Sequence, residues 1–275
     1  MRKIDFAARP SLSLAKVVAN MLPARCISLV LVVVCHVSSA VAGWVQRDTR
    51  TEPSVLAGIV HQHLVVAESG SGAEVTLDLA KFSPKTSRLH LIDNPDGGRA
   101  LAEAMTGQNY AAGVNGGYFD ESFAPLGLRI IDGKQLSPLL RGRLMTGVIS
   151  SSDGTVKIFR VSEFPKNSRA TTAIQCGPFL VDGSRAVPGL NSGRSARRTF
   201  VAATGTDSML GFCSDVSLAE LSAILAAPGA GLKVQRALNL DGGSSSGFWF
   251  KRKDGSPLSI PEQKNVRDFV AVGAK

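Results

Sequence analysis

Short segments rich in Val, Leu and Ile recur along this chain, and Gly, Ser, Pro or Asp residues separate them. Such segments are typical of β-strands. Two helices are expected: one has Asp96 as N-cap and residues 99–105 as its body, and the other opens with the capping box Ser217–Glu220 and ends at Pro228. The pattern predicts an α+β fold, a single domain with mixed, largely antiparallel sheets and two main helices. The segments interpreted as strands are 55–67, 74–79, 88–92, 110–114, 127–131, 144–150, 155–160, 171–181, 199–204, 209–213, 237–240, 248–251 and 268–272.

Residues 1–42 have the pattern of an export leader. A basic stretch precedes the apolar run 26–35, and small residues including Ala40 and Ala42 follow it. We therefore expect a signal peptide at 1–42, a folded domain at 43–275, and a periplasmic or secreted protein. The apolar run is shorter than the roughly 20 residues of a spanning helix, so no stable membrane span is expected after leader removal. An anchor that stays attached is the alternative, and Met21 would make a more usual start than Met1.

The charge of the chain excludes one class of partner. The formal net charge is +9, and the five Lys or Arg and one Asp of residues 1–42 account for four of these charges, leaving about +5. This excess lacks the dense basic stripe of a nucleic-acid-binding protein, and it suits an anionic small substrate or an anionic envelope surface. Cys176 and Cys213 lie in the predicted domain, where an oxidising compartment permits a disulfide. Pairing and burial as two small apolar side chains both remain open.

Two loops share one construction: a short strand, a polar residue, and two glycines. Glycine tolerates positive φ and lets a ligand approach the backbone, so successive N–H groups can bind an anion. Ser244 and Ser245 add hydroxyl donors, although a simple turn is the alternative. The polar side chains would converge if the two strands lay side by side. The residues of the two loops are Asn115, Gly116 and Gly117, and Asp241, Gly242 and Gly243.

An arginine cluster lies between these two loops. Arg198 leads directly into a predicted strand with Thr199, which would hold its guanidinium at a fixed position suited to phosphate oxygens. Arg185, Arg194 and Arg197 lie in a Gly/Ser-rich stretch and are interpreted as ordinary surface charge.

Two further patterns are weaker. Residues 243–247 match the G-x-S-x-G nucleophile elbow, but a strand rather than a helix is predicted after the serine, and the last histidine of the chain, His90, comes earlier. His61 and His63 would share a strand face that could seat a metal, but no third ligand is near, so they are interpreted as structural. No metal and no cofactor is predicted.

The order of motifs is similar to that of the phosphodiester glycosidase family over about residues 55–273. This chain departs from the family pattern at Ser244 and Cys176, where glycine is usual, and in a later glycine at Gly205. These departures leave the substrate open. The motifs are NGGYF at 115–119, QCGPFLVDG at 175–183, Arg198–Thr199 and LNLDGGSS at 238–245.

The resemblance implies hydrolysis of the C1–O bond of a sugar-1-phosphodiester, or of an envelope glycan of that chemistry. Asp241 would act as nucleophile or base, Asn115 would position the sugar or water, and Arg198 would bind the phosphate. A second carboxylate is sought among Asp120, Glu121 and Asp182. A non-catalytic protein that binds an anionic glycan and a metal-dependent phosphodiesterase are the alternatives. Substrate-binding groups are expected at Gly116, Gly117, Thr199, Gly242, Gly243, Ser244 and Ser245.

Overall fold

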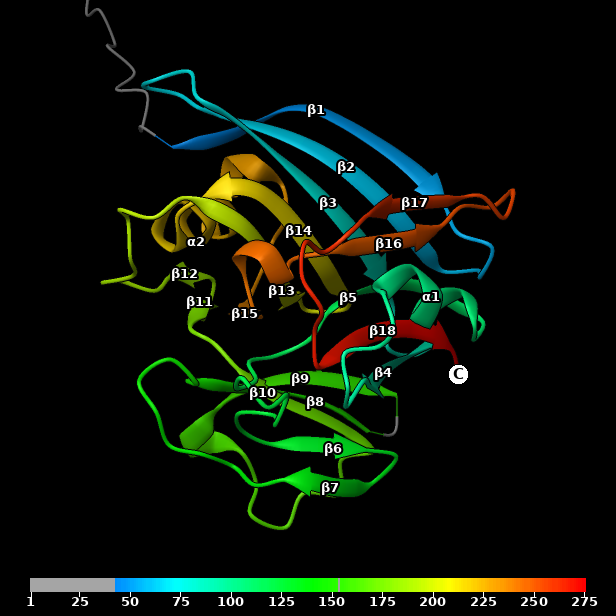
Figure 1. Cartoon of the computed structure of the whole chain (residues 1–275). Coiled ribbons are helices and arrows are strands. Elements are labelled where there is room, and N and C mark those ends of the chain that lie inside the picture. Colours follow the sequence, from blue (N-terminus) through cyan, green and yellow to red (C-terminus); the bar gives the residue numbers. More distant parts are fainter. Residues whose placement is uncertain (1–42, 153) are drawn as a thin grey trace, which may run out of the picture. The chain divides into compact units, whose positions relative to one another are not determined.

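Three antiparallel β-sheets contain about half of the described chain, which is residues 43–152 and 154–275 of this computed structural model (Figure 1). The leader expected at residues 1–42 lies outside the described residues and stays a prediction. The described residues form one compact unit. No helix among them has the length and apolar character that crossing a bilayer requires.

The sheets are named here by their strands. The eight-stranded sheet has the order β1 (Trp44–Pro53), β2 (Ile59–Glu68), β3 (Glu74–Phe82), β14 (Ser208–Val216), β13 (Ala196–Ala203), β15 (Arg236–Asn239), β11 (Phe179–Asp182) and β12 (Arg185–Ala186). The β10 sheet has the order β7 (Lys134–Ser137), β6 (Arg129–Ile131), β10 (Thr172–Cys176), β8 (Gly147–Ser152) and β9 (Thr155–Arg160). The β5 sheet has the order β17 (Pro257–Ile260), β16 (Phe248–Lys251), β5 (Tyr110–Asn115), β18 (Asp268–Ala274) and β4 (Ser87–Asp93).

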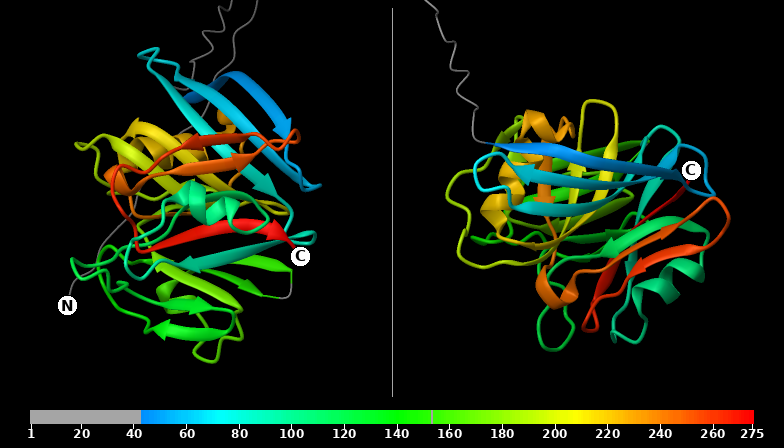
Figure 2. Two further views of the ribbon diagram at one scale, coloured as in Figure 1. Left: turned by 45° about the vertical axis from the view of Figure 1, so that its right-hand side comes forward. Right: turned by 90° about the horizontal axis from the view of Figure 1, so that it is seen from above.

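The main hydrophobic core lies where the three sheets face one another. Alternate residues of a strand point to the same face, so each sheet supplies an apolar row to this core. Two smaller clusters lie under the helices: α2 (Leu218–Ala226) covers the other face of the eight-stranded sheet, and α1 (Leu101–Thr106) packs on the β5 sheet (Figure 2). The shared core includes Val201 and Leu210, Ile149 and Ile174, and Val114 and Val270.

The two predicted helices are present, and the predicted N-terminus of one is wrong. At α2 the capping box is confirmed: Ser217 Oγ accepts from Glu220 N–H at 3.1 Å, and Glu220 Oε2 accepts from Ser217 N–H at 2.8 Å. Asp96 does not cap α1, whose N-cap is Ala100. Asp96 instead accepts from Gly98 N–H at 3.0 Å, a local turn that Asp readily forms.

The strand predicted at 171–181 is also wrong, because it is two strands in different sheets. β10 belongs to the β10 sheet and β11 to the eight-stranded sheet, and Gly177–Pro178 separates them. Proline has no N–H for a ladder and glycine weakens a strand, so the chain leaves one sheet here and joins the other. The strand β1 was not predicted, because most of its side chains are exposed and its sequence lacks an apolar alternation.

The fold class is confirmed only in its coarser part. Every strand pairing in the described residues is antiparallel, and α1 and α2 are the two main helices. The helices are only six and nine residues long. The structure is therefore largely β, with no parallel pairing in the described part of the sheets, rather than the expected α+β mixture.

Candidate active site

The two glycine loops meet, although the strands that deliver them belong to different sheets. β5 ends at Asn115 in the β5 sheet, and β15 delivers Asp241 from the eight-stranded sheet. Asn115 Nδ2 donates to Asp241 O at 2.7 Å, and Asp241 N–H donates to Gly116 O at 3.1 Å. These bonds fix the loop of Asp241 against the loop of Asn115.

Asn115 and Thr199 form the joint between these loops. The Thr199 hydroxyl lies 2.7 Å from Asn115 Oδ1 and 3.1 Å from Asp241 O. Asn115 Oδ1 also accepts from Gly247 N–H at 3.3 Å. Both side chains are buried, and their polar atoms are bonded within the protein. The geometry therefore favours a positioning role for both residues, and their direct contact with a substrate stays a prediction.

The Asp241 carboxylate is half-buried beside one hydroxyl donor. Ser245, which is fully buried, donates its Oγ–H to Asp241 Oδ2 at 2.5 Å. Burial raises the pKa of Asp241, because desolvation disfavours the charged form. The hydrogen bond from Ser245 and the positive charge of Lys264 oppose this rise only in part. Such a carboxyl group can exchange protons closer to neutral pH than an exposed aspartate does.

Arg198 presents part of its guanidinium beside the Asp241 loop. Its Nε donates to Val216 O at 3.1 Å and its Nη2 to Arg194 O at 2.9 Å, which fixes the side chain. In the described residues Nη1 has no acceptor, and a methyl group added at Gly242 would lie 3.2 Å from it. A fixed cation with a free N–H therefore lies next to the first glycine after Asp241.

The remaining residues of the Asp241 loop are open on one side. Gly243 has a φ of 66°, a left-handed conformation that favours glycine, and a methyl group there would meet nothing within 4 Å. Ser244 is exposed, and both residues belong to the 3₁₀ helix η3 (Gly243–Ser245). An anion could approach the backbone here without displacing a side chain.

The other glycine pair is not open in this way. Gly116 N–H donates to Asp268 O and Gly117 N–H donates to Asp268 Oδ1, both at 2.8 Å. These N–H groups therefore hold their own loop. Neither glycine has a free N–H group for a substrate in this structure, and the expected role of Gly116 and Gly117 in substrate binding stays a prediction.

A buried ion pair beneath this loop was missed by the sequence analysis. Arg129 Nε donates to Asp268 Oδ2 at 2.6 Å, and Arg129 Nη2 donates to Tyr118 O at 3.1 Å. Both charged side chains are about 2% exposed. In the sequence, each of the two residues is a charged first residue of an otherwise apolar strand. Arg129 begins β6 and Asp268 begins β18. Nothing in that pattern says that the two charges pair.

The three candidates for a second carboxylate do not contact Asp241. Asp120 is exposed and accepts hydrogen bonds from Ser122 and Ala124 in its own loop. Asp182 forms ion pairs with Arg160 and Arg236. Glu121 is exposed, and no hydrogen bond of its side chain is present in the described residues.

Arg197 differs from the expected surface charge. Its Nη2 donates to Ser246 O and Pro261 O, each at 2.6 Å, and its guanidinium lies 5.1 Å from the centre of the Phe212 ring. Arg197 thus ties the loop that follows Asp241 to residue 261. Arg185 and Arg194 are exposed, as expected.

The sequence patterns considered for a serine nucleophile and for a metal site have other roles in the described residues. The nucleophile elbow is absent at Ser245, because its hydroxyl bonds to Asp241 and the strand β16 follows η3. His61 is buried, with one ring nitrogen 3.0 Å from Glu52 Oε1 and the other 2.9 Å from Asp78 Oδ1, which fits a structural residue. No group of three or more metal-ligating side chains lies together in the described residues.

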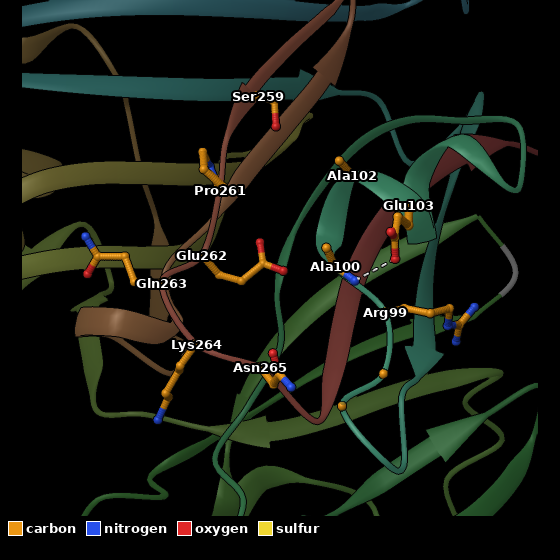
Figure 3. A pocket seen from close by; sticks show the side chains of 12 residues that line it. Arg99, Ala100, Ala102, Glu103, Ser259, Pro261, Glu262, Gln263, Lys264 and Asn265 are labelled. Atoms are coloured by element: carbon orange, nitrogen blue, oxygen red, sulfur yellow. Dashed lines mark hydrogen bonds between the residues drawn. The ribbon is translucent and has the colours of Figure 1, made fainter.

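A polar hollow of about 410 Å³ lies near the site but does not contain Asp241 (Figure 3). It lies between the segment before α1 and residues 259–265, and Glu262 points across it toward Ala100. Glu262 Oε1 accepts from Leu101 N–H at 2.7 Å, so this carboxylate holds the start of α1. Lys264 lines the hollow, and its positive charge lowers the pKa of Asp241.

Comparison with known proteins gives one family. A family model described as phosphodiester glycosidase matches residues 108–272. The uncharacterized protein YigE of Escherichia coli (strain K12) is 29% identical in an alignment 126 residues long, which covers 41% of this chain and 50% of that protein. The chain thus spans about half the length of this curated relative.

Solved structures share the fold at low sequence identity. A hypothetical protein from Synechocystis has a TM-score of 0.64 and 16% identity, over 83% of this chain and 64% of that one. The catalytic domain of zebrafish N-acetylglucosamine-1-phosphodiester alpha-N-acetylglucosaminidase, auto-inhibited by its pro-peptide, has a TM-score of 0.61 and 14% identity, over 83% and 89%. The family model matches more than half of the sequence, and the chain therefore belongs to the phosphodiester glycosidase family.

Proposed function

We propose that this protein is an exported hydrolase that cleaves the glycosidic C1–O bond of a sugar-1-phosphodiester. Water supplies a hydroxyl group to C1, the C1–O bond breaks, and the products are the free sugar and a phosphomonoester. The observation that carries the proposal is a half-buried Asp241 carboxylate followed directly by Gly242, beside which a fixed Arg198 presents its free Nη1. Family membership supports the reaction class.

Arg198 and Asp241 have different roles in the proposed reaction. Arg198 Nη1, which lies beside Gly242, and the open backbone at Gly243 bind the phosphate and stabilise the negative charge that develops on it as it leaves. Asp241 acts at C1 as the nucleophile or as the base that activates water. A phosphomonoester is a good leaving group, so the reaction does not require the protonated second carboxyl group of ordinary glycosidases.

The loop contacts support this division. Ser245 fixes the orientation of the Asp241 carboxylate through its hydrogen bond. Asn115 and Thr199 hold the backbone carbonyl of Asp241. A catalytic group gains from such fixed supports, because a small displacement lowers the rate. The leader pattern of residues 1–42 supports export of the protein.

The substitution Asp241→Asn tests the proposal. It keeps the size of the side chain and removes the charge, so turnover of a panel of sugar-1-phosphodiesters, led by those of N-acetylglucosamine, should fall by about 10²–10⁴-fold. Binding of the substrate measured by calorimetry should persist. The matched control Asp48→Asn removes an exposed carboxylate of β1 and should leave turnover unchanged.

Each other outcome points to a different function. Absence of turnover by the wild-type protein on the whole panel, with binding retained, would favour a non-catalytic glycan-binding protein. Turnover that a chelator abolishes, with release of a sugar phosphate, would favour a metal-dependent phosphodiesterase. Turnover that Asp241→Asn leaves intact would remove Asp241 from the chemistry.

A further inference from the structure

The exposed large hydrophobic side chains of the described residues gather in one stretch of the sequence. Leu144 is the most exposed of them, at 64%. Isolated exposed leucines are common on protein surfaces, but a gathered set marks an interaction surface. The side chains are Leu126, Leu136, Leu139, Leu140 and Leu144.

The same stretch is basic. Lys134, Arg141 and Arg143 are exposed, and the sequence has no Asp or Glu from residue 133 to residue 152. In the part of the chain that the structure describes, none of these three cations lies within ion-pair distance of a carboxylate. We call residues 136–144 the Leu-Arg loop. It combines apolar side chains with positive charges that lack a partner.

A buried glutamine anchors the backbone of this loop. Gln175 is fully buried in β10. Its Oε1 accepts from Leu140 N–H at 2.9 Å, and its Nε2 donates to Leu140 O at 2.5 Å and to Met145 O at 3.2 Å. The backbone is thus tied to the sheet, while the leucine and arginine side chains face outward. Gln175 therefore holds the exposed surface of this loop in a fixed position.

The anchor connects the loop to the candidate active site. Gly177, two residues after Gln175, accepts at its carbonyl from the Tyr118 hydroxyl at 2.6 Å and from Asn239 Nδ2 at 3.2 Å. Asn239 precedes Asp241 by two residues. The Leu-Arg loop and the Asp241 loop are therefore attached to the same short segment, 175–177.

We propose that the Leu-Arg loop docks on a lipid surface with anionic headgroups. Its leucines enter the boundary of the acyl chains, and Arg141 and Arg143 lie among the headgroup phosphates. The charge complementarity favours this partner, because a basic loop with no acidic residue matches an anionic surface. Docking places the Asp241 loop close to the headgroups, and if the proposed function holds, lipid-borne sugar phosphodiesters are the substrates nearest to it.

A local reporter tests this docking in the full chain. In Leu144→Trp the new indole sits on the loop, whereas the native Trp44 and Trp249 are buried. Vesicles of phosphatidylglycerol and phosphatidylcholine at equal amounts should shift its emission to the blue and protect it from acrylamide, and pure phosphatidylcholine should have a much smaller effect. The control Gly70→Trp, in the exposed turn between β2 and β3, should show no shift.

Charge removal supplies the second arm of the test. Adding Arg141→Gln and Arg143→Gln to the reporter should raise the vesicle concentration for the half-maximal shift by about thirtyfold. Arg47→Gln with Arg185→Gln removes equal charge from exposed positions elsewhere and should not raise it. Asp241→Asn should bind vesicles like the wild type, which separates docking from catalysis.

Three results would overturn the proposal. One is an unchanged emission of Leu144→Trp at saturating anionic vesicles. Another is an equal effect of the two arginine pairs. The third is a blue shift that appears without vesicles and grows with protein concentration, because the loop would then bind a second copy of the chain.

Discussion

The surroundings of the Asp241 carboxyl group shift its pKa in opposite directions. Burial raises its pKa, and the Ser245 hydroxyl lowers it by donating a hydrogen bond to the ionised form. In the proposed reaction the ionised form is active. Activity is therefore lost as the pH falls through the pKa of Asp241, and the acid side of the pH profile reports that pKa.

Ser245→Ala should move this acid limb to higher pH. The substitution removes the hydrogen bond that lowers the pKa of Asp241, while burial still raises it. The pKa of Asp241 therefore rises further, and the carboxyl group ionises only at a higher pH. The measurement is kcat/KM against pH. Ser246→Ala is the matched control, because this neighbouring buried hydroxyl has no partner in the described residues. An acid limb that stays in place, or moves to lower pH, would contradict the account.

At the scale of residues, the sequence could suggest candidate groups for the chemistry but not the buried contacts beneath them. Asp241 and Arg198 could be proposed because a carboxylate before two glycines and an arginine entering a strand are local patterns. Arg129 and Asp268 are 139 positions apart, and their pairing depends on how two sheets pack. Local patterns do not encode such a contact, so the ion pair was missed.

At the scale of elements, the ion pair of Arg129 and Asp268 holds the loop after β5. Gly116 packs directly on Asp268, and a methyl group at this position would overlap its carboxylate. The carboxylate cannot move freely, because it bonds to Arg129 and to Gly117 N–H.

Gly116→Ala should therefore destabilise the protein by about 1–3 kcal/mol, the usual cost of overpacking, and lower activity by displacing Asp241. The measurement is urea unfolding at neutral pH. Gly70→Ala serves as its control, since a methyl group there meets nothing within 4 Å, and it should change the free energy of unfolding by less than about 0.5 kcal/mol. Equal effects of the two substitutions would show that the close packing at Gly116 is not important.

Elements were predictable where the local chemistry determined them. The capping box of Ser217 and Glu220 follows from two hydrogen-bonding side chains at the start of α2. The edge strand β1 is mostly polar and exposed, so its sequence has no apolar alternation from which a strand could be predicted. The division of residues 171–181 between two sheets is a property of the tertiary structure, and only Gly177–Pro178 marks it locally.

At the scale of the whole molecule, the structure addresses the open question about the cysteines. Cys176 and Cys213 are both free and buried. Burial raises the pKa of Cys176 to about 12 and raises that of Cys213 as well, so neither thiol is reactive at neutral pH.

The native protein should therefore leave both cysteines unlabelled by iodoacetamide, and unfolding without reductant should expose both to labelling. Peptide mapping by mass spectrometry reads the two sites separately. Reductant should also leave the melting temperature unchanged. A peptide pair linked through Cys176 and Cys213 would contradict this prediction.

The proposed function depends on which bond of the substrate is broken. Hydrolysis of a sugar-1-phosphodiester in ¹⁸O-labelled water tests this directly, with mass analysis of the released phosphomonoester. Cleavage of the C1–O bond adds the water oxygen to the sugar, so the account predicts a phosphomonoester free of ¹⁸O, and loss of this reaction in Asp241→Asn. A phosphomonoester or sugar phosphate that carries ¹⁸O would mean attack at phosphorus and would contradict it.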